Sequence, residues 1–351
     1  MEGWKTSLKA DPTDWLLDPD NPSVRYFALR DLMDYPEGHP EVVEAKNTIE
    51  GSRWVDRILG KQKPGGFWES EDRPYQPRNK ATYWQIIVLS LLGLDKENEG
   101  VRKAVEYIWG FQHGEGGFCS VKEAGALVEY EIQRKRASKR SKELPQFEEW
   151  APGHIRESEM SCLTGNVAAA LIRMGYAEDP RLRRALDWLV EVQNRDGGWL
   201  CPHWRAHIRD KHGCFLGTIP SLDAFSLLPS SFRTTEMDEA VERGVEFLLM
   251  HRLYKADHHG FKVIKESWLK LHYPCLGYDV LRGLDVVTRL GYRGDERIQD
   301  ALEVVMSKQD LDGRWVLEKT PGNMHTSFGA RGRPSKWVTL NAMGVLKRIY
   351  G

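Results

Sequence analysis

A short motif of glutamine, glycine and an aromatic residue recurs along this chain of 351 residues. Four copies begin at Gln62, Gln112, Gln193 and Gln309, and in a fifth copy His251 takes the place of the glutamine. An internal repeat indicates that one supersecondary unit was copied and that the copies stack around a shared core. The repeat therefore limits the fold more than any single residue does.

The spacing of the motifs predicts what each unit contains. Their first residues, at positions 62, 112, 193, 251 and 309, are successively 50, 81, 58 and 58 positions apart. An interval of 50 to 58 residues has room for two helices and two loops, so each unit is expected to be a helical hairpin. The 81-residue interval carries an insertion, which we expect to be a charged loop over 123–152 at the mouth of a central cavity.

Two kinds of helix alternate around the motifs. Amphipathic segments precede four of them, at 101–111, 181–192, 237–250 and 297–307. More apolar segments follow the motifs, at 82–92, 162–174, 214–228, 275–290 and 337–349. An amphipathic helix belongs on the outside of a fold and a helix that is apolar all round belongs inside. With a further helix over 22–33, the pattern predicts an all-α fold, an (α/α) toroid of about six hairpins in a single domain over 1–351.

The motifs themselves are expected to be structural. Glycine adopts the left-handed conformation that commonly ends a helix. The glutamine amide can bind loose backbone groups at that helix end and so join neighbouring turns, and the aromatic residue packs on the next unit. We therefore assign no catalysis to the motifs.

Composition excludes several classes of function. The formal net charge is −1, which gives no bulk attraction to nucleic acid or to an anionic membrane. We find neither a signal peptide nor an apolar run long enough to cross a bilayer, so a cytoplasmic protein without a membrane span is expected. The five cysteines are an odd number in a large chain, which favours reduced thiols over a disulfide framework.

From about Trp54 to the C-terminus, the recurring Q-x(3,4)-G-x-W/F motifs resemble the QW-type turns of the terpenoid cyclase and protein prenyltransferase superfamily. This resemblance implies the same toroid, as in squalene cyclases and prenyltransferase β subunits, and an isoprenoid or similar hydrophobic substrate in a central cavity. The chain lacks the Asp-x-Asp-Asp acid of class II cyclases and the aspartate-rich magnesium motif of class I enzymes. A terpenoid cyclase with a non-standard acid is therefore kept only as an alternative.

Cysteine and histidine residues stand at the expected starts of three consecutive inner helices. These residues are Cys162, His212, Cys214 and His272. Thiolate and imidazole are the ligands that Zn²⁺ prefers, and a catalytic zinc site has three protein ligands and an open position. We predict that these four residues bind zinc, that His212 and Cys214 are catalytic, and that Cys275 is a reserve ligand. The alternative is that the cysteines only pack in the core.

The same residues carry a local resemblance. Prenyltransferase β subunits open one inner helix with Asp-x-Cys and the next with histidine, and His212-Gly-Cys214 and His272 look like these elements, although His212 replaces the aspartate. Lanthionine synthetase cyclases use a cysteine on one helix and a Cys-His pair on the next, and Cys162 followed by His212 and Cys214 resembles that order. Both resemblances imply zinc that activates a thiol, and the first implies a helical partner subunit. Cys119 and Cys201 directly follow turn aromatics and are expected to pack.

A basic loop and a set of aromatic residues are the candidates for substrate binding. Arg205, Arg209 and Lys211 can hold a diphosphate through charge-assisted hydrogen bonds. An apolar chain can bind the aromatic residues expected on the inner wall, which are Tyr83, Trp84, Phe215, Tyr278 and Trp337. A solvated loop and ordinary core packing are the respective alternatives.

Together these features predict a zinc-dependent, prenyltransferase-like transferase. Its partners are expected to be a hydrophobic small molecule or prenyl diphosphate, with a thiol or peptide as acceptor. The alternative from a different class is a non-catalytic toroid that binds a hydrophobic ligand or a peptide.

Overall fold

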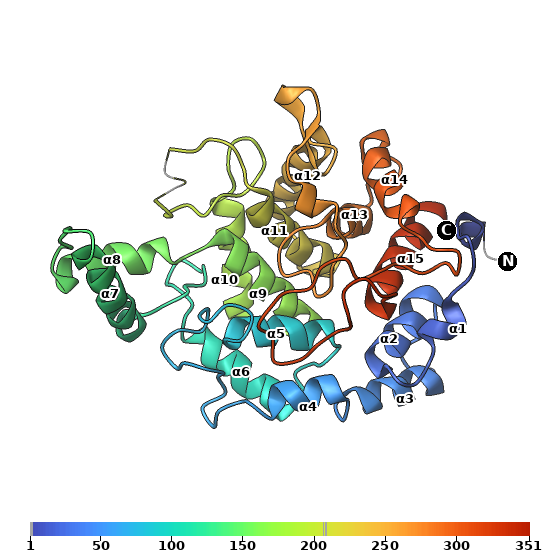
Figure 1. The fold of residues 1–351 in the computed structure, drawn as a ribbon, viewed down its shortest axis with the longest axis horizontal. Helices are drawn as coiled ribbons and strands as arrows, with labels where there is room; N and C mark the ends of the chain where they lie inside the picture. Colours follow the sequence, from blue (N-terminus) through green and yellow to red (C-terminus); the bar gives the residue numbers. More distant parts are fainter. Residues whose placement is uncertain (1–2, 206, 208) are drawn as a thin grey trace. The chain divides into compact units, whose positions relative to one another are not determined.

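The computed structural model describes residues 3–205, 207 and 209–351, and the chain is mostly helical (Figure 1). It forms two compact units, each built from separate stretches of the chain. The first consists of the segment up to Gly60, Leu91–Leu94 and Val245–Gly351, and the second consists of Lys61–Ser90 and Asp95–Gly244. The strands within the described ranges are β1 (Lys255–Ala256) and β2 (Lys262–Val263), a short antiparallel pair. None of the described helices is both long and apolar enough to cross a membrane.

The first unit contains both ends of the described chain (Figure 1). Its α-helices are α1 (Thr13–Leu16), α2 (Pro22–Phe27), α3 (Pro40–Ile49), α4 (Arg53–Leu59), α13 (Val280–Arg289), α14 (Gln299–Ser307) and α15 (Lys336–Tyr350). A π-helical turn, Ala28–Leu32, extends α2. Helix α2 packs on α3, and α13 packs on both α14 and α15. These contacts are the hairpin packing that the repeat predicts.

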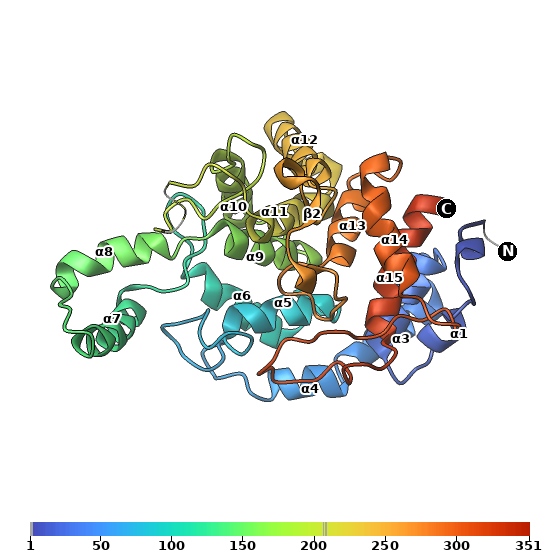
Figure 2. The same cartoon turned by 45° about the horizontal axis from the view of Figure 1, so that its top comes forward.

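The second unit contains the second and third motifs and the insertion between them. Its helices are α5 (Thr82–Leu91), α6 (Glu99–Trp109), α7 (Glu123–Ser138), α8 (Phe147–Glu157), α9 (Ser161–Arg173), α10 (Pro180–Glu191), α11 (Phe215–Leu227) and most of α12 (Thr235–Met250). Helix α9 packs extensively on α11 and also contacts α10, and both views show α9 beside α11 (Figure 2).

Burial separates the two kinds of helix as expected. Nearly every residue of α9 and α11 is buried, whereas α6 and α10 alternate between buried and exposed positions. The all-α class and its outer and inner helices are therefore confirmed. Closure into a ring and the single-domain boundary stay predictions.

One helix begins later than predicted. Residues 275–290 were expected to be helical, but α13 begins at Val280. The side chain of Asp279 accepts a hydrogen bond from the backbone N–H of Arg282 and caps the helix there. Cys275 therefore lies in the bend before α13 and not on the helix.

The turn motifs form one recurring hydrogen-bond unit. The side-chain amide of Gln112 donates to Gly116 O at 2.9 Å and to Arg181 O of the following outer helix at 2.8 Å. Gln193 does the same with Gly197 O and Ala240 O. The structural role of the glutamine is thus confirmed in this unit.

The buried aromatic residue of each motif lies six positions after its glutamine. Its backbone N–H donates to a threonine hydroxyl of the next inner helix in four pairs, Trp68–Thr82, Phe118–Thr164, Trp199–Thr218 and Trp315–Thr339. In the first motif this residue is Trp68, which is fully buried, and not Phe67 as the sequence pattern indicated. Phe67 packs near the surface, against Tyr107.

The insertion is helical, which corrects the expected loop over 123–152. It contains all of α7 and the first half of α8, and these two helices pack on each other. Tyr130 of α7 contacts both Phe147 and Trp150 of α8 through its ring. Glu123 lies in the first turn of α7, and Lys135 and Arg136 lie in its last turn. These charges interact favourably with the helix dipole and so stabilise the helix.

Candidate functional site

Three cysteine residues come together in the second unit. Cys162 is the second residue of α9, Cys201 follows the third turn motif, and Cys214 is the N-cap residue of α11. The Sγ atoms of Cys162 and Cys201 are 3.8 Å apart, which is far beyond the ~2.05 Å of a disulfide bond. All three thiols are free. We refer to Cys162, Cys201 and Cys214 as the thiol cluster.

Backbone and side-chain bonds hold the thiol cluster in place. Ser161, at the start of α9, donates its hydroxyl to Leu200 O at 2.9 Å. The backbone N–H of Cys214 donates to Trp199 O at 2.9 Å. The starts of both inner helices are therefore joined to the two residues that precede Cys201.

The contact between Cys162 and Cys201 changes the pKa of both thiols in opposite directions. A hydrogen bond from Cys162 lowers the pKa of Cys201 to about 5, with a further contribution from His207 and against the effect of burial. The same contact and burial raise the pKa of Cys162, and burial raises the pKa of Cys214. The hydrogen bond with Cys201 in turn raises the pKa of His207. These shifts favour the thiolate form of Cys201, the thiol form of Cys162 and the protonated form of His207.

The donor spacing fits a zinc ion. Two thiolates that are each ~2.3 Å from a tetrahedral Zn²⁺ lie about 3.8 Å apart, since the angle between them is about 109°. The observed separation of the Cys162 and Cys201 sulfur atoms is 3.8 Å. His207 adds an imidazole whose buried Nδ1 has no hydrogen-bond partner among the described residues. Cys162 and Cys201 therefore match the sulfur spacing of two zinc ligands, whereas the described groups of three donors that lie within 4.8 Å of one another do not include this cluster.

An aromatic pair lies beside the thiol cluster. Burial raises the pKa of Tyr75 to about 12, and the charges of Cys162 and Cys201 also raise it, which places the phenol close to them. The rings of Tyr75 and Trp84 are 5.0 Å apart, and the indole N–H of Trp84 donates to Tyr75 O. The guanidinium of Arg78 lies over Trp84, 5.5 Å from the ring centre. Metal donors, apolar rings and a cation thus occur together.

Two of the predicted ligands, Cys162 and Cys214, belong to this cluster, together with two residues that the sequence reasoning did not select. Cys201 was expected only to pack, and His207 was counted only as part of a basic loop. The spacing Cys201-x5-His207-x6-Cys214 was the available signal, because it concentrates three donors within 14 residues.

The other predicted ligands lie elsewhere. His212 is exposed, and its Nδ1 is 2.9 Å from Gly213 O, so its catalytic and metal roles stay predictions. His272 belongs to the first unit, where its Nδ1 is 2.9 Å from a carboxylate oxygen of Asp279. Cys275 completes a group with these two whose donor atoms lie within 4.8 Å of one another.

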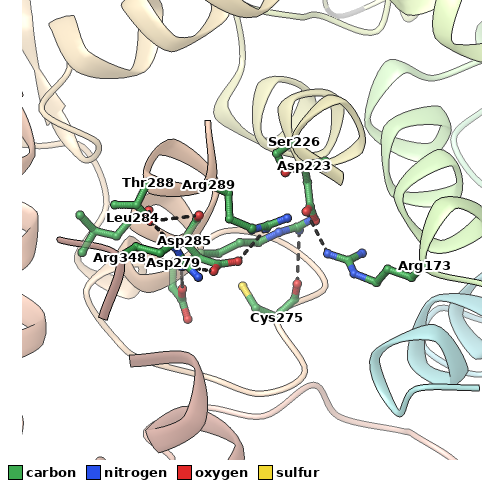
Figure 3. A network of polar contacts seen from close by, with 11 residues as sticks. Arg173, Asp223, Ser226, Cys275, Asp279, Leu284, Asp285, Thr288, Arg289 and Arg348 are labelled. Atoms are coloured by element: carbon green, nitrogen blue, oxygen red, sulfur yellow. Dashed lines mark hydrogen bonds and ion pairs between the residues drawn. The ribbon is translucent and has the colours of Figure 1, made fainter. Parts of the chain in front are cut away.

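Burial and charge act against each other at His272. Burial lowers its pKa, but the charges of Cys275 and Asp279 and its hydrogen bonds with them outweigh this effect and raise the pKa to about 11. Figure 3 shows Cys275 and Asp279 beside a network in which Asp285 binds Arg289 and Arg348. His272 is buried, and its partners Asp279 and Cys275 also belong to the first unit.

The basic loop faces solvent. The Arg205 side chain is 80% exposed and is paired with Glu157 at 3.1 Å, while Arg209 and Lys211 are exposed. Arg205 and Glu157 line a pocket of about 490 Å³ with Trp150. Residues 206 and 208 of this loop lie outside the described residues. Diphosphate binding by the loop stays a prediction.

The aromatic residues expected on the cavity wall are mainly buried in the core. Tyr83 donates its hydroxyl to Cys119 O at 2.9 Å, and Phe215 is 5% exposed at the start of α11. In the first unit, Tyr278 donates to Leu253 O, and Trp337 stacks on Tyr273 at 4.6 Å. Of the five predicted residues, Trp84 is the one that belongs to the aromatic pair beside the thiols.

Comparisons with known proteins find similarity in structure but not in sequence. No protein-family model matches the chain, and no curated protein matches it. A protein from Actinoplanes is similar in structure, with 14% identity over 95% of this chain and 90% of the other and a TM-score of 0.46. The type II terpene cyclase MstE from Scytonema without ligand has 14% identity over 93% and 87%, with a TM-score of 0.45. A variant of MstE in complex with merosterolic acid A has 15% identity over 96% and 97%, with a TM-score of 0.47.

Proposed function

We propose that this chain is a zinc-dependent enzyme that acts on an isoprenoid or similar hydrophobic substrate. The zinc would be held by Cys162, Cys201 and Cys214, with a fourth position open beside His207. The observation that carries the proposal is the 3.8 Å separation of two sulfur atoms in a cluster of free cysteines, of which Cys201 is buried and the other two are partly buried. This separation suits ligands of one tetrahedral ion.

Cys201 and His207 would support a nucleophile bound at the thiol cluster. Bound zinc would act as a Lewis acid that keeps a thiol or water deprotonated near neutral pH. The contact with Cys162 lowers the pKa of Cys201 to about 5, so Cys201 would bind as a thiolate. The contact with Cys201 raises the pKa of His207, so His207 would hold a proton more readily while the thiolate charge is present and could release it when that charge is neutralised. The chain thus offers thiolate donors and a proton carrier in one place.

The aromatic pair supports a hydrophobic substrate. Tyr75 and Trp84 offer ring faces beside the thiols, and such faces bind apolar chains and stabilise positive charge. Arg78 lies over the same indole and would pair with an anionic leaving group such as diphosphate. A prenyl diphosphate combines both properties, which is why we propose it as the substrate class.

A second candidate is a non-catalytic protein in which the metal is structural. It is favoured by His207, because a fourth protein ligand would close the coordination sphere. Cobalt substitution separates the two candidates. Added thiol should change the visible spectrum of the cobalt protein if one position is open, and it should leave the spectrum unchanged if four protein ligands close the site.

The proposal is tested by metal analysis of the purified chain. We expect about one zinc per chain, and loss of that zinc in Cys201→Ser and Cys214→Ser. Cys275→Ser is the matched control, because Cys275 lies in the first unit, and it should keep the metal. A metal-free wild-type protein that is fully folded, with a Cys214→Ala variant that behaves normally, would refute the zinc site.

Activity is tested with prenyl diphosphates in the presence and absence of a thiol acceptor. A prenylated thiol would show transfer, and a cyclic hydrocarbon formed without the thiol would show the cyclase that we kept as an alternative. Loss of both products in Cys201→Ser would tie the activity to the cluster. No product from any prenyl diphosphate would remove the proposed substrate class.

A further inference from the structure

A second group of potential ligands lies in the same unit, outside the thiol cluster. His113 and Glu115 belong to the second turn motif, and Glu159 lies between α8 and α9. One donor atom from each of these residues lies within 4.8 Å of the others. His203, in the loop after the third motif, places its Nε2 3.7 Å from the second carboxylate oxygen of Glu159. We refer to these four residues as the Glu159 cluster.

The protein satisfies the Glu159 carboxylate only in part. Its side chain is 1% exposed, and within the described part of the chain its Oε1 atom has no hydrogen-bond partner that meets geometric criteria. Burial raises the pKa of Glu159, and the charge of His113 and a backbone hydrogen bond from Gly117 offset this effect only partly. The nearest cationic candidate at that oxygen, His113 Nδ1, is 3.7 Å away, which is too far for a hydrogen bond. An unpaired buried carboxylate is unfavourable by several kcal/mol, so a charge that binds Oε1 would be strongly stabilising.

The backbone holds Glu159 in this position. The N–H of Ser120 donates to Ser158 O at 3.1 Å, and Cys119 forms an isolated antiparallel bridge with Glu159. Gly117 leaves the space that the carboxylate fills, because a Cβ atom there would lie 2.4 Å from Oε1. The carboxylate is therefore directed at the second turn by the fold and not by a flexible loop.

The second motif differs from its copies at the residue that faces Glu159. The residue after the motif glutamine is His113 here, whereas Lys63, Asn194 and Asp310 occupy this position in the other glutamine motifs. Only histidine among these four side chains is a common ligand of transition metals through nitrogen. Among the glutamine motifs, only the copy that lies against the buried carboxylate thus carries an imidazole at this position.

We propose that His113, Glu115, Glu159 and His203 bind a divalent first-row cation such as Mn²⁺ or Fe²⁺. Imidazole and carboxylate donors suit these ions, in contrast to the thiolates that select zinc. Donor atoms about 2.1 Å from an octahedral ion lie about 3.0 Å or about 4.2 Å apart. The distances from His113 Nδ1 and His203 Nε2 to the Glu159 carboxylate are both 3.7 Å and fall between these values, so small side-chain movements can bring the donors around one ion.

Charge and access are consistent with this site. The two carboxylates of Glu115 and Glu159 match the charge of a divalent ion, while the nearby positive charge of Arg156 opposes it in part. The His113 side chain is 47% exposed, so an ion can reach Glu159 from solvent through the turn. The inference does not depend on the proposed zinc function, because the two sites share no ligand.

The test uses Mn²⁺ as the probe on the full chain. Electron paramagnetic resonance of free Mn²⁺ counts the bound ion, and we expect one per chain in the wild-type protein. Glu159→Gln should weaken binding at least tenfold, since it removes the charged central donor. The matched control is Glu157→Gln, two residues away, whose carboxylate is paired with Arg205 and which should bind as the wild type does.

Two further variants keep the result decisive. His113→Gln changes a half-exposed turn residue and should also weaken Mn²⁺ binding, even if Glu159→Gln fails to fold. Cys201→Ser should leave Mn²⁺ binding unchanged, which separates this site from the thiol cluster. Without metal, Glu159→Gln should melt at a higher temperature than the wild type, because it removes an unpaired buried charge. Folded wild-type protein that binds no Mn²⁺, or His113→Gln and Glu159→Gln variants that bind it normally, would overturn the proposal.

Discussion

The pairing of each turn aromatic with a threonine of the next inner helix gives a quantitative prediction. In the third motif, the backbone N–H of Trp199 donates to the hydroxyl of Thr218 at 3.0 Å. Both residues are fully buried, so water cannot replace the threonine hydroxyl. Thr218→Val keeps the branched shape but removes this acceptor. The Trp199 N–H is then a buried donor without a partner.

The expected loss of stability follows from that unpaired donor. Leaving a buried backbone N–H unsatisfied costs about 1–3 kcal/mol, and the additional methyl group of valine recovers only a small part of it. With a urea m-value of about 2 kcal/mol/M, the unfolding midpoint should fall by about 0.5–1.5 M. Thr218→Ser keeps the hydroxyl, so its smaller loss comes from one buried methyl group and should be about 1 kcal/mol.

Urea unfolding followed by tryptophan fluorescence measures both variants. Thr48→Val is the matched control, because Thr48 is exposed on α3 and its hydroxyl donates only within its own helix. It should change the free energy of unfolding by less than about 0.5 kcal/mol. A Thr218→Val protein as stable as the wild type, or no less stable than Thr218→Ser, would show that the hydroxyl does not hold the turn.

Three other predictions concern charge and backbone conformation. Alkylation of Cys201 in metal-free protein should follow a pKa near 5. This folded-state pKa lies below the pKa of about 8.5 of an unfolded thiol, so ionisation of Cys201 should stabilise the folded chain above about pH 8.5. Thermal melts across pH should show that this stabilisation is lost as the pH falls toward 5. Gly197→Ala should destabilise the chain by more than about 1 kcal/mol, because Gly197 has φ +88° and a Cβ atom there would lie 2.2 Å from a backbone oxygen. Gly114→Ala is the control: no described atom lies within 4 Å of a Cβ atom at Gly114, so this variant should be nearly neutral in the same melts. Asp279→Asn should lower the pKa of His272 from about 11, as followed by the NMR shift of the imidazole, and an unchanged pKa would exclude the carboxylate as its cause.

Local periodicity carried most of the correct predictions. Residues such as Leu182, Ala185 and Leu189 recur at helical spacing, so one buried face of α10 is visible without any knowledge of its neighbours. The same holds for the glutamine, since its partner glycine lies four residues away. Features that depend on nearby residues in the chain could therefore be predicted.

The predictions were wrong where contacts between residues distant in sequence decide the structure, or where two neighbouring residues fit the pattern equally well. Phe67 and Trp68 both follow the glycine pair, and only packing against the next helix selects Trp68 as the buried residue. The insertion over 123–152 contains a dense basic run at 134–140, and α7 presents only a narrow buried face, so its helical pattern is weak. Cys201 meets Cys162 across 39 residues of sequence, so its role depends on how α9 is placed.

The glutamine bonds also set an order for completing the fold during synthesis. Gln112 binds the carbonyl of Arg181, which is 69 residues later in the chain. When the second turn leaves the ribosome, the side-chain amide of Gln112 therefore cannot form this hydrogen bond. It has to wait until the following outer helix, which contains Arg181, has also emerged. Because synthesis proceeds at about 5–20 residues per second, each such turn waits for several seconds in an incomplete state. During that interval the turn is exposed to chaperones and proteases in a form that the finished protein never shows.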